Sequence, residues 1–379
     1  MSDLSLILLS AGNSSRFSMG VKKHWLRVNH MPLWQFVAHK LQKTQKFSQI
    51  IVVSSDEDIT FMKNYADFTF VKGGSSRQQS LKNALNSVTS KYVLVSDIAR
   101  ACINDDFLER IIVKKGESDC IVPYLNVTDT IVYEDATIDR DKVKRIQTPQ
   151  LSLTNVLRDA LNTDEEFTDE SSAIVANGGK RTFILGDEDA HKITYIKDLN
   201  KIPCLDAPSS DTLSGNGFDV HAFDTQGEMW LGGVKIESDY GFLAHSDGDV
   251  ALHSLIDALL GAAGMGDIGM LFPDNDDKYK GIDSKELLKI VVTKLNSFGF
   301  VIINVDITIA AQKPRIGKYK LAMREVIAEI LGIDRARVNV KATTTEKLGF
   351  VGREEGVAVT SNANLKYFNW KNIKDCKII

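Results

Sequence analysis

Short apolar runs and amphipathic segments alternate through the first two hundred residues of the chain. The apolar runs of strand length are 6–9, 50–53, 92–95 and 120–123. Between the first two runs, Leu33, Val37 and Leu41 recur at the spacing that places side chains on one face of a helix. Alternation of strands with helices predicts a mostly parallel sheet covered by helices, with ligands bound beyond the carboxyl ends of its strands.

The pattern breaks at residues 200–217, which are rich in Pro, Ser, Asp and Gly, and this composition is typical of a linker. A second set of elements follows: strands at 218–223 and 301–309, and helices at 250–263 and 284–296. The strand at 301–309 is expected to be half-buried, because apolar and polar residues alternate along it.

A chain of 379 residues exceeds what one hydrophobic core usually organises. We therefore predict two domains of the α/β class, 1–205 and 215–379, joined by a linker at 206–214. The first is expected to be Rossmann-like with a mostly parallel sheet, and the second to carry a separate α/β or α+β sheet.

Composition narrows the class of protein. A net charge of −4 argues against a dedicated nucleic-acid-binding protein. The four cysteines are scattered without a C-x-x-C pair, so we expect neither a disulfide framework nor a cysteine zinc site, and a reducing compartment. No apolar run reaches the length that spans a bilayer, which predicts a soluble, cytoplasmic protein without membrane contact.

Three segments of the first half carry candidate phosphate chemistry. The first strand leads into SAGNSSRF and then KKHWL, which bring Arg16 and Lys23 after a glycine loop, and GGSSRQQSL adds Arg77. Asp97 ends the strand at 92–97, where a carboxylate can hold Mg²⁺ against phosphate oxygens. The alternatives are a polar loop with solvated basic residues, and an Asp97 that caps a helix or pairs with Arg100.

In the second half, FDVHAF and the histidine-containing HSDGDVALHSLID predict a metal site. Asp219 and His221 stand at i and i+2 on one face of a strand, and a helix beginning near Gly248 would carry His253 and Asp257 on one face. One carboxylate and two imidazoles suit Zn²⁺ with an open fourth position. A structural zinc site and histidines that only pack are the alternatives.

Other polar segments of this half are candidates for phosphate and nucleotide binding. They are GDIGMLFPDNDD with Asp267, Asp274 and Asp276, AQKPRIG with Lys313 and Arg315, and KATTTEKLGF with Glu346 as a possible Mg²⁺ ligand. Taken singly, each of these segments would more often be a solvated loop or a helix start capped by Thr344 or Thr345.

Taken together, the segments of the first half resemble the 2-C-methyl-D-erythritol 4-phosphate cytidylyltransferases over residues 3–205. The segments that carry the resemblance, in order, are SAGNSSRF, KKHWL, GGSSRQQSL, LVSDIARACI, VTDT, DRDKVKRIQTPQ, TDESSA and HKIT. Lys22 and Ala101 depart from this family, which usually has proline at both positions.

This resemblance implies roles for individual residues. Arg16 and Lys23 would stabilise charge on the α-phosphate of CTP, and Asp97 would lie near Mg²⁺. The residues implied in the cytidine and phosphate pocket are Gly12, Gly74, Arg77 and Ser80. Those implied to hold methylerythritol phosphate are Thr130, Arg140 and Lys192. The family forms dimers through an arm around VTDT, so Thr130 and Arg140 are expected to act across that interface.

The second half resembles the 2-C-methyl-D-erythritol 2,4-cyclodiphosphate synthases over residues 217–366, through GFDVHAF, LAHSDGDVALH, GDIG, LFPD and VKATTTEKLGFVGREEG. The resemblance implies a trimer, Zn²⁺ on Asp219, His221 and His253, and Mg²⁺ on Glu346. His245 and Thr344 would stabilise the transition state. The remaining residues implied to bind substrate are Ser246, Asp267, Ile268, Gly269, Asp274, Asp276, Ala311, Arg315, Thr343, Thr345, Phe350 and Arg353. Arg353 and Glu355 would lie near the trimer axis, where some relatives bind isoprenoid diphosphates.

Both resemblances together predict a bifunctional enzyme of isoprenoid-precursor synthesis. It would transfer CMP from CTP to methylerythritol phosphate, and later cyclise the 2-phosphorylated product with loss of CMP. Dimeric and trimeric contacts in one chain predict a homo-oligomer that can close as a hexamer, with a transient partner in the kinase that acts between the two steps. The rival interpretations are a nucleotidyltransferase for another polyol phosphate fused to a metal-dependent phosphate-binding domain, and a non-catalytic nucleotide sensor.

Overall fold

A computed structural model describes residues 3–12, 14–17, 19–225, 227–243, 246–273 and 281–375 of the chain. The chain forms two compact units, Met1–Pro208 together with Asn369–Ile379, and Ser209–Phe368. The C-terminal segment from Asn369 therefore belongs to the first unit, although it follows the second unit in sequence. None of the described helices combines the length and the apolar character needed to cross a membrane.

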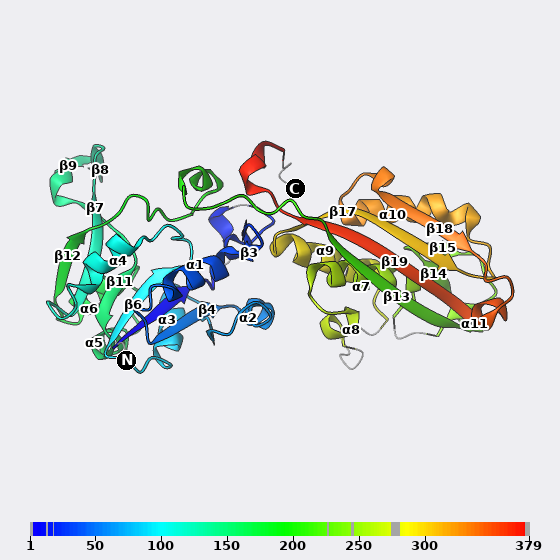
Figure 1. Cartoon of the computed structure of the whole chain (residues 1–379), viewed down its shortest axis with the longest axis horizontal. Helices are drawn as coiled ribbons and strands as arrows, with labels where there is room; N and C mark the ends of the chain where they lie inside the picture. The colour runs from blue at the N-terminus through cyan, green and yellow to red at the C-terminus, as the bar shows by residue number, and fades with distance from the viewer. Residues whose placement is uncertain are drawn as a thin grey trace. The chain divides into compact units, whose positions relative to one another are not determined.

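The first unit is built on an eight-stranded sheet with the strand order β10-β7-β11-β6-β1-β4-β5, in which β12 also pairs with β7 (Figure 1). The pairs β1/β4, β1/β6, β4/β5 and β7/β12 are parallel. The pairs that β11 and β10 make are antiparallel. This confirms the predicted α/β class with a mostly parallel first sheet. Because β1 lies between β4 and β6, the strand order reverses at β1, where α/β sheets place ligands.

The four predicted strands of this unit are present, and so is the predicted helix. The strands of the first unit are β1 (Leu4–Leu9), β2 (Arg27–Val28), β3 (Met31–Pro32), β4 (Gln49–Ser54), β5 (Thr69–Lys72), β6 (Tyr92–Asp97), β7 (Cys120–Asn126), β8 (Ile131–Tyr133), β9 (Ala136–Ile138), β10 (Lys144–Ile146), β11 (Gln150–Leu153) and β12 (Arg181–Leu185). Its helices are α1 (Leu33–Gln42), α2 (Asp56–Met62), α3 (Arg77–Leu85), α4 (Asp105–Ile112), α5 (Thr154–Ala160) and α6 (Glu170–Ala176). Its 3-10 turns are η1 (Ser15–Phe17), η2 (Lys23–Trp25), η3 (Arg140–Lys142), η4 (Ile196–Lys201) and η8 (Trp370–Asp375).

Side-chain caps fix where several of these helices begin. Ser55, Ser76 and Asn104 each accept a hydrogen bond from a backbone N–H of the first turn, at the starts of α2, α3 and α4. A hydrophobic core that includes Ile7, Ile51 and other strand residues packs between the sheet and its helices. The loops that follow the buried strands are thereby held in place at the sheet edge.

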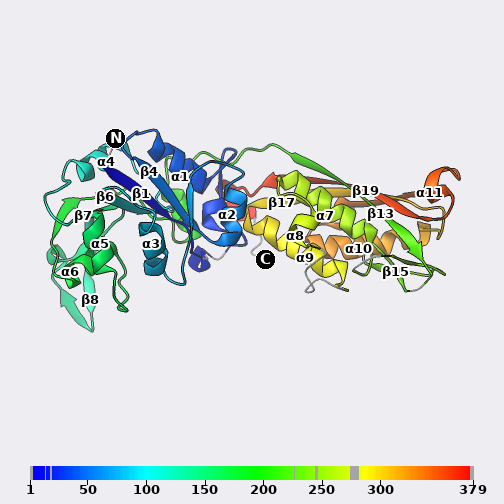
Figure 2. The same cartoon turned by 90° about the horizontal axis from the view of Figure 1, so that it is seen from below.

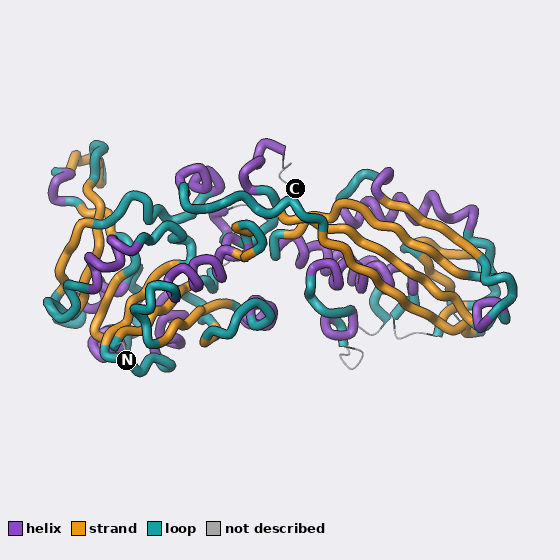
Figure 3. Tube along the Cα trace, in the orientation of Figure 1, coloured by secondary structure: helices purple, strands orange, loops and turns teal. Residues whose placement is uncertain are grey.

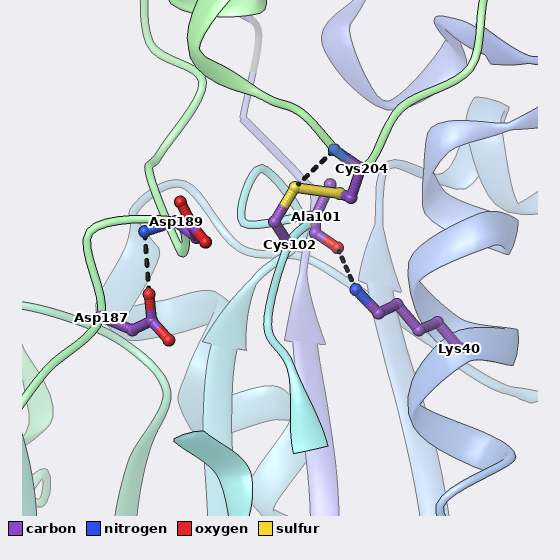
Figure 4. Close-up of a disulfide and its surroundings, with 6 residues drawn as sticks. All are labelled: Lys40, Ala101, Cys102, Asp187, Asp189 and Cys204. Carbon is purple, nitrogen blue, oxygen red and sulfur yellow. Dashed lines mark hydrogen bonds between the residues drawn. A yellow bond between two sulfur atoms is a disulfide. The ribbon is translucent and has the colours of Figure 1, made fainter. Parts of the chain in front are cut away.

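One expectation about the cysteines is wrong. Cys102 and Cys204 form a disulfide, at a sequence separation of 102 (Figure 4). The bond ties the loop after β6 to the segment that ends the first unit, next to the point where Lys40 Nζ donates to the Ala101 carbonyl at 3.2 Å. Two cysteines this far apart leave no spacing signal, so only the folded chain brings them together. Cys120 is buried as a free thiol, and Cys376 lies outside the described residues.

The second unit contains a five-stranded sheet with the order β16-β13-β19-β17-β18. Its long strands are drawn in orange at the right of Figure 3. Its pairs are antiparallel except for β17 with β18. The helices α7, α9 and α10 lie along one side of this sheet (Figure 2). On the other side, Phe218 and Val220 of β13 are exposed in the single chain.

The predicted helix at 250–263 has the same bounds in the structure. The strands of the second unit are β13 (Leu213–Asp224), β14 (Met229–Leu231), β15 (Val234–Ile236), β16 (Gly241–Phe242), β17 (Phe300–Ala310), β18 (Val338–Thr343) and β19 (Gly356–Tyr367). Its helices are α7 (Val250–Ala263), α8 (Ile268–Leu271), α9 (Ser284–Ser297), α10 (Lys320–Leu331) and α11 (Gly349–Gly352), with 3-10 turns η6 (Gly317–Tyr319) and η7 (Arg335–Arg337).

The glycines that suggested a linker up to residue 217 have another cause. Gly215 and Gly217 lie inside β13, where α7 packs directly on the strand. A Cβ atom at Gly217 would lie 2.0 Å from the Ser254 carbonyl oxygen, and one at Gly215 would lie 2.1 Å from that of Ala258. Glycine is therefore required at both positions for the helix and the strand to approach closely.

Candidate functional site

A cavity of about 500 Å³ lies in the first unit, next to the carboxyl ends of β1 and β6. Its walls come from the loop after β1, the η2 turn, the loop before α3 and the residues that follow β6. The predicted residues that line it are Gly12, Arg16, Lys23, Gly74, Arg77, Ser80, Asp97 and Lys192. Eight residues predicted from separate segments thus meet around one space.

The loop before α3 lies close to the loop after β1 at this cavity. A Cβ atom on Gly73 would lie 2.4 Å from the Ala11 Cβ, so a side chain there would push the two loops apart. Ser80 Oγ accepts from the Gly74 N–H at 3.0 Å and fixes the loop from the helix side. A Cβ atom on Gly74 would lie 2.2 Å from Gln79 Cγ, so packing favours glycine at both positions.

Asp97 is the centre of a charged network on the cavity wall. Lys192 Nζ donates to Asp97 Oδ2 at 2.6 Å, and Arg77 Nε donates to Oδ1 at 3.4 Å. Arg100 instead donates to the Thr148 hydroxyl at 2.8 Å and the Ala190 carbonyl at 2.7 Å. Asp97 therefore pairs with residues distant in sequence, and the simpler alternative of a pair with Arg100 alone does not describe it.

Charge and burial shift the acidity of this network. Burial by itself would raise the pKa of Asp97, but the charges of Arg77 and Lys192 lower it to about 2. Burial, with repulsion from Lys192 and Arg16, lowers the pKa of Lys23. Since four cationic side chains and one carboxylate line the cavity, it favours an anionic ligand such as a polyphosphate.

Glu170 is a member of this network that the sequence analysis did not single out. Its Oε1 accepts from Arg77 NH1 at 2.6 Å, and its side chain is fully buried at the start of α6. Burial raises the pKa of Glu170, and the charge of Arg77 opposes this rise. The only sequence signal was its place in TDESSA, because 93 residues separate it from Arg77.

Thr130 and Arg140 are not among the described residues that line this cavity. They flank the hairpin of β8 and β9, and Arg140 NH1 donates to the Thr128 carbonyl at 2.6 Å. Val132 and Tyr133 of the same hairpin are more than half exposed in the single chain. The role predicted for Thr130 and Arg140 at a neighbouring subunit's site stays a prediction.

In the second unit, Asp219, His221 and His253 come together as a possible metal site. One ligand atom from each of the three residues lies within 4.8 Å of the others. Asp219 Oδ2 is 3.3 Å from His221 Nδ1 and 3.4 Å from His253 Nδ1. Burial opposes the change, but the two imidazoles lower the pKa of Asp219 to about 2. A carboxylate that stays ionised beside two imidazoles matches the ligand set of a divalent metal.

The far side of the His253 ring is also held by hydrogen bonds. His253 Nε2 lies 2.9 Å from Ser284 Oγ and 3.2 Å from Ser246 Oγ. The Ser284 hydroxyl donates to Asp247. This leaves His253 Nδ1 facing Asp219, which is the orientation that a ligand to a shared metal needs. Asp257 is not part of the cluster, since its carboxylate accepts from the Ile268 N–H at 2.8 Å.

The other predicted residues of this half that the structure describes lie in or near α8, after β17, and from the end of β18 to the residue after α11, apart from Ser246 before α7. Asp267 caps α8 by accepting from the Met270 N–H at 2.8 Å. Thr344 Oγ1 donates to Glu346 Oε1 at 2.8 Å, so neither Thr344 nor Thr345 caps α11, whose N-cap residue is Leu348. Predicted residues close to these elements in sequence are Ile268, Gly269, Ala311, Arg315, Thr343, Phe350 and Arg353. His245, Asp274 and Asp276 lie outside the described residues.

Comparisons with known proteins give the same division of the chain into two halves. The 2-C-methyl-D-erythritol 4-phosphate cytidylyltransferase family matches residues 4–203, and the YgbB family matches residues 213–366. The bifunctional enzyme IspD/IspF of Sulfurimonas denitrificans is 71% identical over 98% of this chain and 96% of its own length. That of Aliarcobacter butzleri is 56% identical over 98% of this chain and 100% of its own.

A solved structure has the same architecture. The bifunctional IspDF from Campylobacter jejuni superimposes with a TM-score of 0.91 at 48% identity, and covers 98% of this chain and 100% of that one. Both units thus match one relative in which the two halves are joined in the same order.

Proposed function

The chain belongs to the family of bifunctional IspD/IspF enzymes, and from this premise we propose which of its residues perform each reaction. The first half is a CTP-dependent cytidylyltransferase that transfers CMP from CTP to 2-C-methyl-D-erythritol 4-phosphate and releases diphosphate. The second half is a cyclodiphosphate synthase that closes the 2-phosphorylated product into the 2,4-cyclodiphosphate and releases CMP.

In the first half, we assign the triphosphate of CTP to the cavity beside Asp97. Arg16 and Lys23 would stabilise the negative charge that develops on the α-phosphorus as the sugar phosphate attacks. Gly12, Gly74 and Ser80 would bind the cytidine and phosphates through backbone and hydroxyl groups. The clustering of Arg16, Lys23, Arg77 and Lys192 around one space is the observation that carries this proposal.

The ion pairs of Asp97 affect how this carboxylate could bind Mg²⁺. Both carboxylate oxygens contact a cation, Oδ2 with Lys192 and Oδ1 with Arg77. We therefore propose that Asp97 gives up its contact with Lys192 as substrates bind, and that it would then help to hold Mg²⁺ beside the phosphates of CTP. Lys192 would then be free to hold methylerythritol phosphate, together with Thr130 and Arg140 from a neighbouring subunit.

In the second half, we propose that Asp219, His221 and His253 hold Zn²⁺. One carboxylate and two imidazoles with converging ligand atoms fit this ion, and the hydrogen bond that His253 Nε2 donates to Ser284 Oγ orients His253 toward it. A bound zinc ion supplies polarisation of a phosphate oxygen. Glu346 is proposed to hold Mg²⁺ with the substrate's own phosphates, because Mg²⁺ commonly takes few protein ligands.

We propose that the neighbouring residues bind and orient the substrate. Thr344 and His245 would donate hydrogen bonds to the phosphate oxygens as charge builds up there. The diol would contact residues 267–269, the cytosine would contact the segment from Ala311 to Arg315, and other contacts would come from Ser246, Asp274, Asp276, Thr343, Thr345, Phe350 and Arg353. Lys313 Nζ lies 3.0 Å from Glu354 Oε2, an ion pair that ties the segment after β17 to the loop before β19.

We also propose an oligomeric state and a cellular location for the protein. The exposed Phe218 and Val220 face of the second unit would form a trimer, and the β8–β9 hairpin would form a dimer, so that the full chain closes as a hexamer. The protein would work in the cytoplasm, and the kinase that acts between the two reactions would contact it transiently.

Paired assays on the purified full chain test these assignments. Diphosphate release from CTP and methylerythritol phosphate is expected to depend on Arg16 and Lys23. CMP release from the 2-phosphorylated intermediate is expected to depend on His253 and to be lost with a zinc chelator. A chelator that leaves CMP release intact contradicts the zinc assignment, and a fully active Lys23→Ala variant contradicts the role of Lys23.

A further inference from the structure

Asp58 is a buried carboxylate on α2 that lies outside the cavity, and none of the reaction steps above uses it. It is only 2% exposed, although it stands in the first turn of a helix whose neighbouring acids face solvent. Ser55 Oγ caps the helix by accepting from the Asp58 N–H at 3.1 Å, and its hydroxyl donates to Asp58 Oδ2 at 2.7 Å. The contact with the capping residue explains a polar side chain at this position. It does not explain why the side chain is buried, because an exposed carboxylate could make the same contact.

The remaining contacts of Asp58 all go to one short segment of the chain. Lys22 Nζ donates to Asp58 Oδ1 at 2.9 Å, and Trp25 Nε1 donates to the same oxygen at 2.8 Å. His24 Nε2 lies 3.2 Å from Oδ2. Burial works against ionisation, yet the contacts with His24 and the hydrogen bonds from Ser55 and Trp25 hold the pKa of Asp58 well below its usual range.

Within the described turn at residues 22–25, Lys23 is the residue that forms neither a hydrogen bond nor an ion pair with Asp58. Its side chain lines the cavity, and its Nζ donates to the Ile193 carbonyl at 3.1 Å. The segment is a tight 3-10 turn, in which the N–H of Trp25 donates to the Lys22 carbonyl at 3.0 Å. Because successive side chains of such a turn point about 120° apart, holding residues 22, 24 and 25 leaves one direction for residue 23.

The turn contains two consecutive lysines, so the fold must determine which of them faces the cavity. Lys22 and Lys23 carry the same charge, and an anionic ligand would attract either of them. Lys22 is not among the residues that line the cavity, and it pairs with Asp58 and, at 3.3 Å, with Glu57. We propose that Asp58 is a positioning residue for cytidylyl transfer: it holds the turn at residues 22–25 so that Lys23, and not Lys22, faces the nucleotide.

This inference rests on the role assigned to Lys23 above, so its test measures both. In the full-length chain, Asp58→Asn keeps an oxygen acceptor for Trp25 but removes the charge that holds Lys22 and His24. The kcat for cytidylyl transfer is expected to fall about 10- to 100-fold, the cost of a misplacement near 1 Å, while the KM for CTP changes much less. CMP release by the second half of the same molecule is expected to stay unchanged, and a far-UV circular dichroism spectrum that matches the wild type's reports that the first half is folded.

A double-mutant cycle separates positioning from a general structural effect. If Asp58 acts through Lys23, Asp58→Asn is expected to change kcat less than about twofold in a Lys23→Ala background. The matched control is Asp56→Asn, an exposed acid of the same helix that pairs with Lys72, and it is expected to leave both activities unchanged. Removing the competing cation, as Asp58→Asn with Lys22→Met, is expected to restore part of the lost kcat.

Three results would overturn the inference. They are an unchanged kcat in Asp58→Asn, an equal loss of kcat in the wild-type and Lys23→Ala backgrounds, and a parallel loss of the cyclase activity. If Lys23→Ala by itself retains full activity, the assignment of Lys23 fails and the positioning role fails with it. A defective Lys23→Ala combined with a normal Asp58→Asn refutes the positioning role alone.

Discussion

The C-terminal segment offers a stability test that depends on one side chain. Trp370 is 2% exposed, and its Nε1 donates to the Arg27 carbonyl at 2.7 Å. It belongs to η8, which packs beside η4 in the first unit. We predict that Trp370→Ala destabilises the cytidylyltransferase half, although residue 370 follows the cyclase half in sequence.

The size of the effect follows from the buried area and the hydrogen bond. A buried tryptophan removes about 150–250 Å² from water, which is worth about 4–6 kcal/mol at ~25 cal/mol per Å². Measured Trp→Ala changes in cores lie near 3–5 kcal/mol, and the hydrogen bond to Arg27 accounts for about 1 kcal/mol of such a loss. At roughly 2–4 °C per kcal/mol for domains of this size, a loss of about 3 kcal/mol lowers the unfolding temperature by about 6–12 °C.

The assay uses the two activities to tell the halves apart. Samples of the full chain are heated in steps and cooled, and diphosphate release and CMP release are measured on each. Trp370→Ala is expected to lower the inactivation temperature of the first activity only. Trp370→Phe keeps an aromatic ring but not the donor and should cost about 1–2 kcal/mol. Lys371→Ala removes the ammonium group that lies 5.0 Å from the centroid of the Trp370 ring, and should cost about 0.5–1 kcal/mol. The reasoning would be refuted if Trp370→Ala left the inactivation temperature of diphosphate release unchanged, or lowered the inactivation temperatures of both activities equally.

Three further predictions concern the metal site, the charged network and the disulfide. His253→Ala should weaken zinc binding by more than the 10- to 100-fold that is typical when a residue hydrogen-bonded to a metal ligand is lost, while diphosphate release stays normal. A zinc content of the dialysed variant equal to that of the wild type would contradict this. The pKa of Asp97, lowered from 3.8 to about 2, gives about 2 kcal/mol of stability that is present above pH 4 and lost as the pH falls toward 2. The gap in unfolding free energy between wild type and Asp97→Asn should therefore shrink over that range in urea titrations, and a constant gap would argue against it. Because the Cys102–Cys204 bond closes a loop of about 100 residues, Cys102→Ser should cost about 2–4 kcal/mol in the same titrations; thiol counts that show both cysteines reduced in the native chain would remove the basis for this.

Local patterns were enough to predict the elements and much of each site. The helix at 250–263 is apolar over most of its surface and ends at a glycine, Gly264, so its bounds follow from composition alone. Asp219 and His221 share a strand face because side chains alternate along any strand. The loops after β1 and β6 were correctly expected at one edge, because parallel strands bring their carboxyl ends together.

Contacts between distant segments could not be predicted in this way. Glu170 lies 93 residues from Arg77, and Asp58 lies 36 from Lys22, so no short pattern links either pair. No sequence pattern predicted that Cys102 and Cys204 would pair. Trp370 was predicted to belong to the second half, but in the structure it lies beside Arg27. Periodicity and spacing act over a few residues of chain, and they determined which segments are helices, strands and anion-binding loops. Which buried charge faces which partner depends on how the sheets and helices pack, and only the tertiary structure decided that.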